Sequence, residues 1–398
     1  MKVLRIVLVV LMLATAATLA FSASEQEEAV EDTECQADLT KSLSVDTSGI
    51  KTTDNQPLVE YEKTRNVPTK PADPSALPEM DALHWYEIEY AGYNTVKMDM
   101  PERPACGAYG KYVVLLQPGQ HPYWTSWLNG FNKIAEAYNL KTKIYNANWA
   151  LDLQAQQVEQ AINDKPDMIV MGPTDQAGSV PMLRKLWQAG IPVVTSNVAP
   201  SEEGMKYCLA HVGPEDWEYY RKSARYMADK LGKKGGYVVV QSIPGISCFN
   251  SRYWSVVTEL VTYAPNMKLL DADTSMCQTE PTFALVSTWL AKYGDELQGI
   301  ILPDAGPTVS GTMEAARKAG RYDLVIMTGG HCKLAQDAVK TGEFPGITLT
   351  YQSGESDGAC ALQVAVDWMN GKDLKNVYAI KQGFITSKEV DNYYPAQH

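Results

Sequence analysis

Residues 111–124 read Lys-Tyr-Val-Val-Leu-Leu-Gln-Pro-Gly-Gln-His-Pro-Tyr-Trp, an apolar run followed by a polar turn that contains Pro and Gly. The run predicts a buried β-strand, and the aromatic pair after the turn lies at the expected start of a helix. The same order recurs as far as 190–198, Gly-Ile-Pro-Val-Val-Thr-Ser-Asn-Val. Strands that alternate with helices form parallel sheets, and small ligands bind at the carboxyl edge of such sheets.

The pattern continues beyond residue 198. Apolar residues at helical spacing, as at Trp127, Phe131 and Ile134, indicate helices between the strands. Strands separated by helices of about 10–15 residues form βαβ units. The pattern is longer than a usual single domain, so we expect two α/β lobes. The predicted strands are 111–117, 142–145, 168–171, 192–195, 237–241, 268–271, 299–302, 324–327 and 347–350.

The amino-terminal residues predict export. Met1–Arg5 contains two basic residues, Ile6–Ala20 is apolar, and small residues follow up to Ala23. This order is typical of a secretory signal peptide over residues 1–23. An uncleaved membrane anchor is the alternative, because the apolar stretch is about long enough to span a bilayer. We therefore expect a periplasmic or extracellular protein, either free or tethered by its signal segment.

Residues 24–80 differ in composition from the rest of the chain. An acidic run at 25–32 is followed by a stretch with several prolines and few apolar residues. Such a segment buries too little apolar surface to fold alone, so we expect a flexible linker or an extended arm over the body. Residues 81–106 are richer in aromatic side chains and are expected to form an N-terminal extension packed on the body.

The net charge argues against a nucleic-acid partner. It is −12 for the whole chain, and loss of Lys2 and Arg5 with residues 1–23 makes it −14. Binding to phosphates requires clustered Lys and Arg. The acidic body favours a monomeric soluble protein that handles a neutral or cationic small molecule.

The cysteines are consistent with an oxidising compartment. Those at 106–360 are expected to form up to three disulfides, and Cys35 is expected to be unpaired; buried free thiols are the alternative. No Cys-x-x-Cys pair occurs, which disfavours zinc and thioredoxin-like chemistry. The seven residues are Cys35, Cys106, Cys208, Cys248, Cys277, Cys332 and Cys360.

Several short motifs occur in an order that is typical of a known family. They are Gln-His-Pro-Tyr-Trp at 120–124, Pro-Asp-Met-Ile-Val-Met-Gly-Pro-Thr-Asp at 166–175, Ala-Gly-Ile-Pro-Val-Val-Thr-Ser-Asn at 189–197, Gly-Ile-Ser-Cys-Phe-Asn-Ser-Arg at 245–252, Gly-Ile-Ile-Leu-Pro-Asp at 299–304 and Thr-Tyr-Gln-Ser at 350–353. With them, residues 111 to about 390 resemble the type I periplasmic sugar-binding proteins of ABC transporters, in the ribose- and galactose-binding branch.

The resemblance implies two Rossmann-like lobes with parallel sheets joined by a three-strand hinge. The crossings are expected near 210–215, 351–355 and 379–384. Lobe 1 then comprises 107–212 plus 353–379, and lobe 2 comprises 213–352 plus 380–391.

The resemblance also implies a function. It predicts the substrate-binding protein of an ABC importer, which captures a small sugar or polyol between its lobes and delivers it to a membrane permease. A sensing module that presents its liganded form to a receptor kinase or chemoreceptor is the alternative. A repressor of the same fold is disfavoured by the signal peptide and by the lack of a helix-turn-helix.

Recognition of a sugar sets physical requirements. Its hydroxyls pair with planar polar side chains that donate and accept hydrogen bonds, and its C–H faces pack on aromatic rings. The ligand-binding residues that the resemblance implies are Gln120, His121, Tyr123, Trp124, Asn197, Arg252, Asp304, His331 and Gln352.

In lobe 1 the aromatic pair is Tyr123 and Trp124. The polar residue before it is Gln120 or His121, and Asn197 follows the fourth strand. A core position is the alternative for Trp124, because apolar residues share its expected helix face.

In lobe 2 Arg252 lies on a helix, and Asp304 follows the strand 299–302. Gln352 lies at the hinge, and His331 is the candidate at the end of the next strand. The alternatives are an exposed helical arginine for Arg252, a helix N-cap for Asp304 and a loop histidine for His331.

Two departures from the family bear on the ligand. Asn197-Val198 stands where the family carries Asp-Arg, and Thr328-Gly329-Gly330-His331 stands where it carries Gly-Phe-Asp. We therefore expect a ligand other than an ordinary pyranose in the usual pose; a sugar alcohol, a smaller polyol and a non-sugar metabolite stay open. No calcium loop and no catalytic or nucleotide motif is recognisable, so we expect no metal, no cofactor and no enzyme activity.

Overall fold

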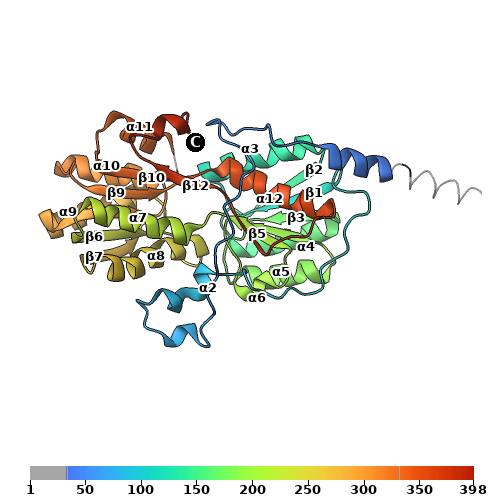
Figure 1. The fold of residues 1–398 in the computed structure, drawn as a ribbon, viewed down its shortest axis with the longest axis horizontal. Helices are drawn as coiled ribbons and strands as arrows, with labels where there is room; N and C mark the ends of the chain where they lie inside the picture. The colour runs from blue at the N-terminus through green and yellow to red at the C-terminus, as the bar shows by residue number, and fades with distance from the viewer. Residues whose placement is uncertain (1–32, 34, 331) are drawn as a thin grey trace, which may run out of the picture.

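The computed structural model describes residues 33, 35–330 and 332–398 and shows two α/β lobes side by side (Figure 1). Each lobe is built on a six-stranded sheet. Across the first sheet the order is β11 (Val377–Ala379), β5 (Ala210–Gly213), β4 (Val193–Ser196), β3 (Met168–Met171), β1 (Tyr112–Gln117) and β2 (Lys141–Asn146).

The second sheet has the same plan with one antiparallel edge. Its order is β12 (Gln382–Ile385), β10 (Ile347–Gln352), β9 (Val325–Gly329), β8 (Leu297–Leu302), β6 (Lys234–Gln241) and β7 (Asn266–Thr274). The pair β10–β12 is antiparallel, and the other neighbours in both sheets are parallel. The predicted class of two parallel α/β lobes is thereby confirmed.

Helices cover the faces of both sheets. Lobe 1 carries α3 (Pro122–Ala137), α4 (Leu151–Asp164), α5 (Ser179–Gln188), α6 (Glu202–Met205) and α12 (Gly354–Met369). Lobe 2 carries α7 (Asp216–Lys230), α8 (Ser247–Tyr263), α9 (Thr279–Tyr293), η3 (Gly294–Glu296), α10 (Pro307–Ala319), α11 (Lys333–Thr341) and η4 (Val390–Tyr393).

The buried strands explain why the sequence folds in this way. The side chains of Val113, Val114, Leu115 and Leu116 in β1 are fully buried, because helices cover both faces of a parallel sheet. The nine predicted strands all occur, with shifts of a few residues at their ends. The short strands β5, β11 and β12 lie outside the predicted set.

Helices α3 and α12 approach very closely beside the hinge. A Cβ atom added at Gly358 would lie 1.9 Å from the carbonyl oxygen of Trp127, and one added at Gly130 would lie 1.8 Å from that of Glu355. Only glycine fits at these positions. The close contact fixes the amino-terminal ends of both helices at the cleft.

Three crossings join the lobes. They run from β5 to α7, from β10 to α12 and from β11 to β12. Because β11 belongs to the first sheet and β12 to the second, the chain changes lobe within residues 379–382.

Residues 51–65 lie against these crossings. Tyr61 forms an antiparallel bridge with Ile380, and Lys381 donates its amide to the carbonyl of Glu60 at 3.0 Å. At another crossing, the amide of Thr53 donates to Glu355 Oε2 at 2.8 Å. We call residues 51–65 the arm.

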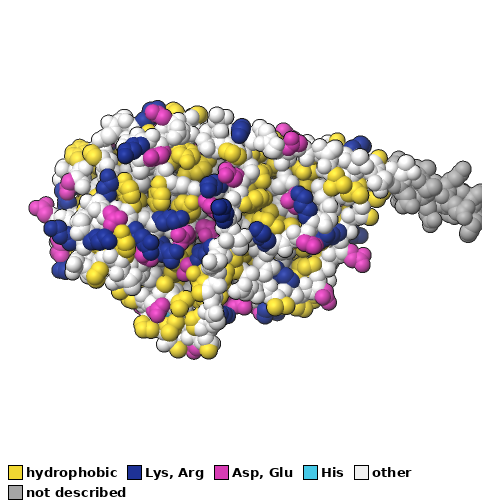
Figure 2. All heavy atoms as spheres, in the orientation of Figure 1, with side chains coloured by type: hydrophobic (Ala, Val, Ile, Leu, Met, Phe, Trp, Pro, Cys, Tyr) yellow, Lys and Arg dark blue, Asp and Glu magenta, His cyan; other side chains and the backbone are white. Residues whose placement is uncertain are grey.

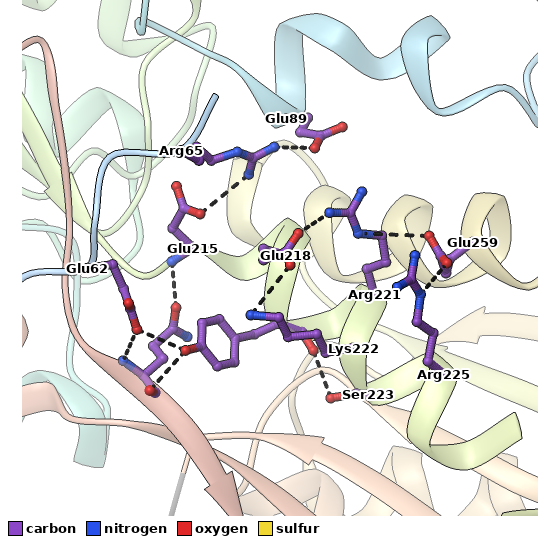
Figure 3. Close-up of polar contacts among 12 residues, drawn as sticks. Glu62, Arg65, Glu89, Glu215, Glu218, Arg221, Lys222, Ser223, Arg225 and Glu259 are labelled. Atoms are coloured by element: carbon purple, nitrogen blue, oxygen red, sulfur yellow. Dashed lines mark hydrogen bonds and ion pairs between the residues drawn. The ribbon is translucent and has the colours of Figure 1, made fainter. Parts of the chain in front are cut away.

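Arg65 joins the arm to the third crossing, from β5 to α7. Its guanidinium pairs with Glu89 of α2 (Tyr86–Glu89) and lies 3.5 Å from Glu215 Oε2 (Figure 3). Glu215 in turn donates its amide to Gln382 Oε1 at 2.7 Å. The arm therefore contacts all three crossings.

Residues 51–65 thus run as an extended segment against the body. Leu58 is fully buried, Val59 and Tyr61 pack against the core of lobe 1, and polar contacts of the backbone and side chains add to this attachment. The signal segment 1–23 and the acidic run 25–32 lie outside the described residues.

The N-terminal extension, residues 81–106, packs on both lobes. Its first part contains η2 (Ala82–Trp85) and α2, with η1 (Pro74–Ala76) just before it, and lies on lobe 2. Its second part lies on lobe 1, where Lys97 Nζ donates to the carbonyl of Met205 at 2.7 Å. The ring of Trp85 stacks on that of Trp254 in α8, with centroids 3.8 Å apart. Lys and Arg side chains lie among Asp and Glu over the neighbouring face of lobe 2, where α7 lies (Figure 2).

One disulfide joins Cys35 to Cys106. The expectation that Cys35 is unpaired was wrong, as was the pairing expected within the 106–360 set. The other cysteines are free thiols, and all but the half-buried Cys277 are buried. The pairing follows from the path of residues 35–106, which brings both ends of this segment to the same place.

Candidate ligand-binding site

A cavity of about 710 Å³, including its open mouth, lies between the lobes. The carboxyl ends of β4, β8, β9 and β10 border it, as expected for parallel sheets. Of the nine candidate residues, those that line the cavity are His121, Tyr123, Trp124, Asn197, Arg252, Asp304 and Gln352.

The lobe 1 wall is organised by a carboxyl group that the sequence analysis missed. Asp357 in α12 is fully buried and accepts hydrogen bonds from Tyr123 Oη at 2.8 Å and from Asn197 Nδ2 at 3.0 Å. Ser196 Oγ donates to its other oxygen at 3.1 Å. Asp357 thus fixes two of the side chains in this wall, Tyr123 and Asn197.

The backbone of Asn197 supports the same geometry. Its φ is +66°, a region that Asn adopts more readily than most residues. This conformation directs the chain out of β4 at the cavity.

The ionisation of Asp357 is poised near neutrality. Burial raises its pKa to about 7, and the hydrogen bonds from Asn197, Tyr123 and Ser196 oppose this effect. Burial also raises the pKa of Tyr123.

The lobe 2 wall is organised by Arg252. This guanidinium is buried, and its Nε lies 2.8 Å from Asp216 Oδ1. Nη2 donates to Gln352 Oε1 at 3.1 Å, and Nη1 donates to the carbonyl of Pro303. Arg252 is therefore an ion-paired residue of the wall and not an exposed helical arginine.

The amide of Gln352 connects the two walls. Its Nε2 donates to Tyr123 Oη at 3.5 Å, while its Oε1 accepts from Arg252. A continuous polar chain therefore runs from Asp216 in lobe 2 to Asp357 in lobe 1.

Asp304 offers an acceptor to the cavity. One oxygen accepts from the amide and the hydroxyl of Thr308. The other, Oδ2, is buried without a hydrogen-bond partner and lies 4.0 Å from His121 Nε2 of lobe 1. Burial lowers the pKa of His121, although the charge of Asp304 opposes this shift. A donor on a ligand would satisfy Oδ2.

His121 also shapes the lobe 1 loop. Its Nδ1 accepts from the amide of Tyr123 at 3.1 Å and caps α3. Trp124 is 3% exposed and packs on Trp127, with ring centroids 5.3 Å apart. It therefore combines a core position with a place in the cavity wall.

Gln120 lies outside the cavity lining. Its side chain is exposed, and its carbonyl accepts from the indole of Trp149 at 3.2 Å. Trp149 itself lines the cavity, as do Phe249 and His398. His331 lies outside the described residues.

The lobes are in contact beside the cavity, as in a closed form. Ala199 donates its amide to Ser247 Oγ at 2.9 Å, and Gln176 donates its amide to the carbonyl of Gly245 at 3.0 Å. Val198 of lobe 1 packs with Ile246 of lobe 2 in one apolar cluster. A ligand in the cavity would be enclosed from both sides.

Metal and membrane features are absent from the described part of the chain. Residues 33, 35–330 and 332–398 contain no group of three His, Cys, Asp or Glu side chains that could hold a metal ion. None of the helices formed by these residues has the length and apolarity needed to cross a membrane.

A sequence model of the periplasmic binding protein domain matches residues 112–373. The chain belongs to the periplasmic binding protein family. The match covers both lobes and confirms the resemblance that the motifs indicate.

Relatives of this periplasmic binding protein are distant in sequence. A xylitol-binding protein of Mycolicibacterium smegmatis is 27% identical over 267 residues, which are 67% of this chain and 74% of that protein. An ABC transporter solute-binding protein of Bacillus halodurans, solved with myo-inositol, has a TM-score of 0.66 at 20% identity and covers 72% of this chain and 98% of its own. The fructose-binding periplasmic domain of a hybrid two-component system has a TM-score of 0.64 at 17% identity. The match covers 70% of this chain and 92% of that domain.

Proposed function

We propose that this periplasmic binding protein captures a small sugar or polyol in the cavity between its lobes and delivers it to the membrane permease of an ABC importer. The main support is the composition of the cavity wall. Asp304 is an acceptor, Arg252 is a donor, and the amides of Asn197 and Gln352 carry both functions. A hydroxyl both donates and accepts, so a polyhydroxylated ligand matches this set.

Aromatic rings complete the match. Tyr123, Trp149 and Phe249 line the same cavity and offer apolar surface to C–H groups. Relatives described as binding xylitol and myo-inositol support a polyol over a charged metabolite.

We further propose that the protein acts in the periplasm or outside the cell and performs no catalysis. The signal-like segment at 1–23 supports export. The polar side chains of the wall are engaged in holding one another, as Arg252 holds Gln352 and Asp357 holds Tyr123. Such an arrangement suits binding.

A thermal-shift screen over pentoses, hexoses, sugar alcohols and cyclitols tests the binding function. A ligand at 100 times its dissociation constant should stabilise the native state by about 2.7 kcal/mol. Titration calorimetry on each hit, with Asn197→Ala as the matched site variant, checks that binding occurs in the cavity. The absence of any shift across the library, with turnover of one of its compounds, would overturn the proposal.

Sensing is the second candidate, because the fructose-binding domain of a two-component system shares the fold. Transport and sensing differ in the partner that recognises the closed lobes. Deletion of the gene should abolish uptake of the labelled ligand if the protein serves a permease. Intact uptake with a lost transcriptional response to the ligand would favour sensing.

A further inference from the structure

The last residues of the chain, Pro395–His398, pass from lobe 2 to lobe 1 across the cleft. We call this segment the strap. The preceding strand β12 and helix η4 belong to lobe 2. The end of the chain lies between α11 of lobe 2 and α3 of lobe 1 (Figure 1).

The root of the strap is fixed on lobe 2. Gln336 Nε2 in α11 donates to the carbonyl of Tyr393 at 2.8 Å. The amide of Lys333, in the same helix, donates to the carbonyl of His398 at 2.9 Å. Helix α11 thus contacts the chain just before the strap and again at its last residue.

Gln397 attaches the strap to the start of α12 in lobe 1 and to the arm. Its Oε1 accepts from the amide of Glu355, the second residue of α12, at 3.1 Å. Its Nε2 donates to Ser353 Oγ and to Asp54 Oδ1, each at 2.8 Å. Ser353 and Asp54 are buried, so these bonds are made away from water.

His398 carries the strap into the ligand cavity. Its Nδ1 lies 3.2 Å from Ser126 Oγ in α3, and its ring stands edge-on to that of Tyr123 with centroids 6.4 Å apart. The residue is part of the cavity wall. It thus lies beside an aromatic residue of the proposed ligand site while its backbone is bound to the opposite lobe.

We propose that His398 is a specificity-determining residue of the ligand site, held against the ligand by the strap when the lobes close. The proposal rests on the proposed binding function. An imidazole supplies a flat ring together with nitrogens that donate or accept. The strap adds bonds between the lobes that separation of the lobes would break, so it slows ligand release.

Two variants separate the roles of ring and strap. His398→Ala removes the ring and leaves the bonds of Gln397, so it should change the order of affinities across a ligand panel. Gln397→Ala removes the side-chain bonds of the strap to Ser353, Glu355 and Asp54 and leaves the contacts of Ser126 Oγ with the strap. It should raise the dissociation rate of every ligand by about tenfold, the effect of one to two net hydrogen bonds, with a nearly unchanged association rate. His398→Gln should restore part of the lost selectivity, because an amide also donates and accepts.

Lys340→Ala is the matched control. It removes an exposed ion pair with Asp391 near the root of the strap, 2.7 Å long, and touches neither lobe 1 nor the cavity. Stopped-flow binding should give wild-type rates for this variant. If His398→Ala changes all affinities equally and in proportion to thermal stability, the residue is only structural and the proposal is overturned.

A measurement without ligand separates this proposal from the binding function. Small-angle X-ray scattering of the unliganded protein should show a larger radius of gyration for Gln397→Ala than for wild type and for Lys340→Ala. Equal radii for all three proteins would overturn the proposal that the strap holds the lobes together. A wild-type protein that binds nothing from the library overturns the binding function and the ligand role of His398, while the scattering still decides whether the strap holds the lobes together.

Discussion

Truncation of Arg252 to alanine should destabilise the fold as well as weaken ligand binding. Arg252 is 7% exposed and Asp216 is 6% exposed, and their side chains approach to 2.8 Å. Arg252→Ala leaves the Asp216 carboxyl buried without its cation. Removal of one partner of a buried ion pair costs about 3–5 kcal/mol of unfolding free energy. Burial already raises the pKa of Asp216 against the charge of Arg252, so the variant should take up a proton there.

Arg252→Ala should also weaken ligand binding, independently of its effect on stability. Arg252 also orients Gln352, so truncation removes a charged donor from the wall and frees that amide. A hydrogen bond to a charged group is worth about 1.5–3 kcal/mol, which is a weakening of roughly tenfold to a hundredfold.

Urea denaturation measures the first effect and titration calorimetry the second. The double variant Arg252→Met, Asp216→Leu removes both charges and fills the space, so it should recover most of the stability while binding stays weak. A wild-type urea midpoint for Arg252→Ala would refute the reasoning. Equal losses in the single and double variants would do the same, because the cost would then not come from an unpaired Asp216.

Three further outcomes are expected. Because burial raises the pKa of Asp357 to about 7, the folded protein keeps a proton that the unfolded chain releases near pH 4, so the unfolding free energy should fall between about pH 4 and 7 and then level off. Urea titrations should show this slope in wild type and not in Asp357→Asn; parallel profiles would contradict it. Tyr123→Phe keeps the ring but removes the hydroxyl that contacts Asp357, and calorimetry should show binding weaker by about threefold to tenfold, whereas wild-type affinity would place the hydroxyl outside recognition. Reduction of the Cys35–Cys106 disulfide should lower the unfolding free energy by about 2–5 kcal/mol, and Cys35→Ser should lose the same amount without reductant; a stable reduced protein would show that the other contacts of residues 35–106 suffice.

Strands buried on both faces could be predicted because their apolar runs are decided locally. Strand β3 begins and ends at the predicted residues, 168 and 171. Strands β5 and β11 are four and three residues long, and pairing with each other and with β4 stabilises them. Such strands depend on distant partners, which a single stretch of sequence does not reveal.

The candidate site was predictable where its residues follow strands. Asn197 and Asp304 each come two residues after a predicted strand, 192–195 and 299–302, and line the cavity. Asp357 lies within a helix that is buried at nearly every position, and its burial depends on the close contact of α3 and α12. His398 reaches the site only through the fold of the last residues. Trp149 also lines the cavity and was not predicted. It lies in the Asn-Ala-Asn-Trp turn at the end of β2, and this turn is a local signal for a residue at the carboxyl edge of the sheet.

Because the arm contacts all three crossings, amide hydrogen exchange at the hinge should report on opening of the cleft. The amide of Lys381 is bonded to Glu60, and that of Gln382 to Glu62 Oε1 at 3.2 Å, so neither amide faces water freely. Both amides should exchange with deuterium slowly, at rates set by how often the arm detaches from the crossing. If rotation of the lobes requires the arm to detach, the two amides should exchange at the rate at which the cavity opens. The free energy of detaching the arm is then part of the free energy of opening the cleft.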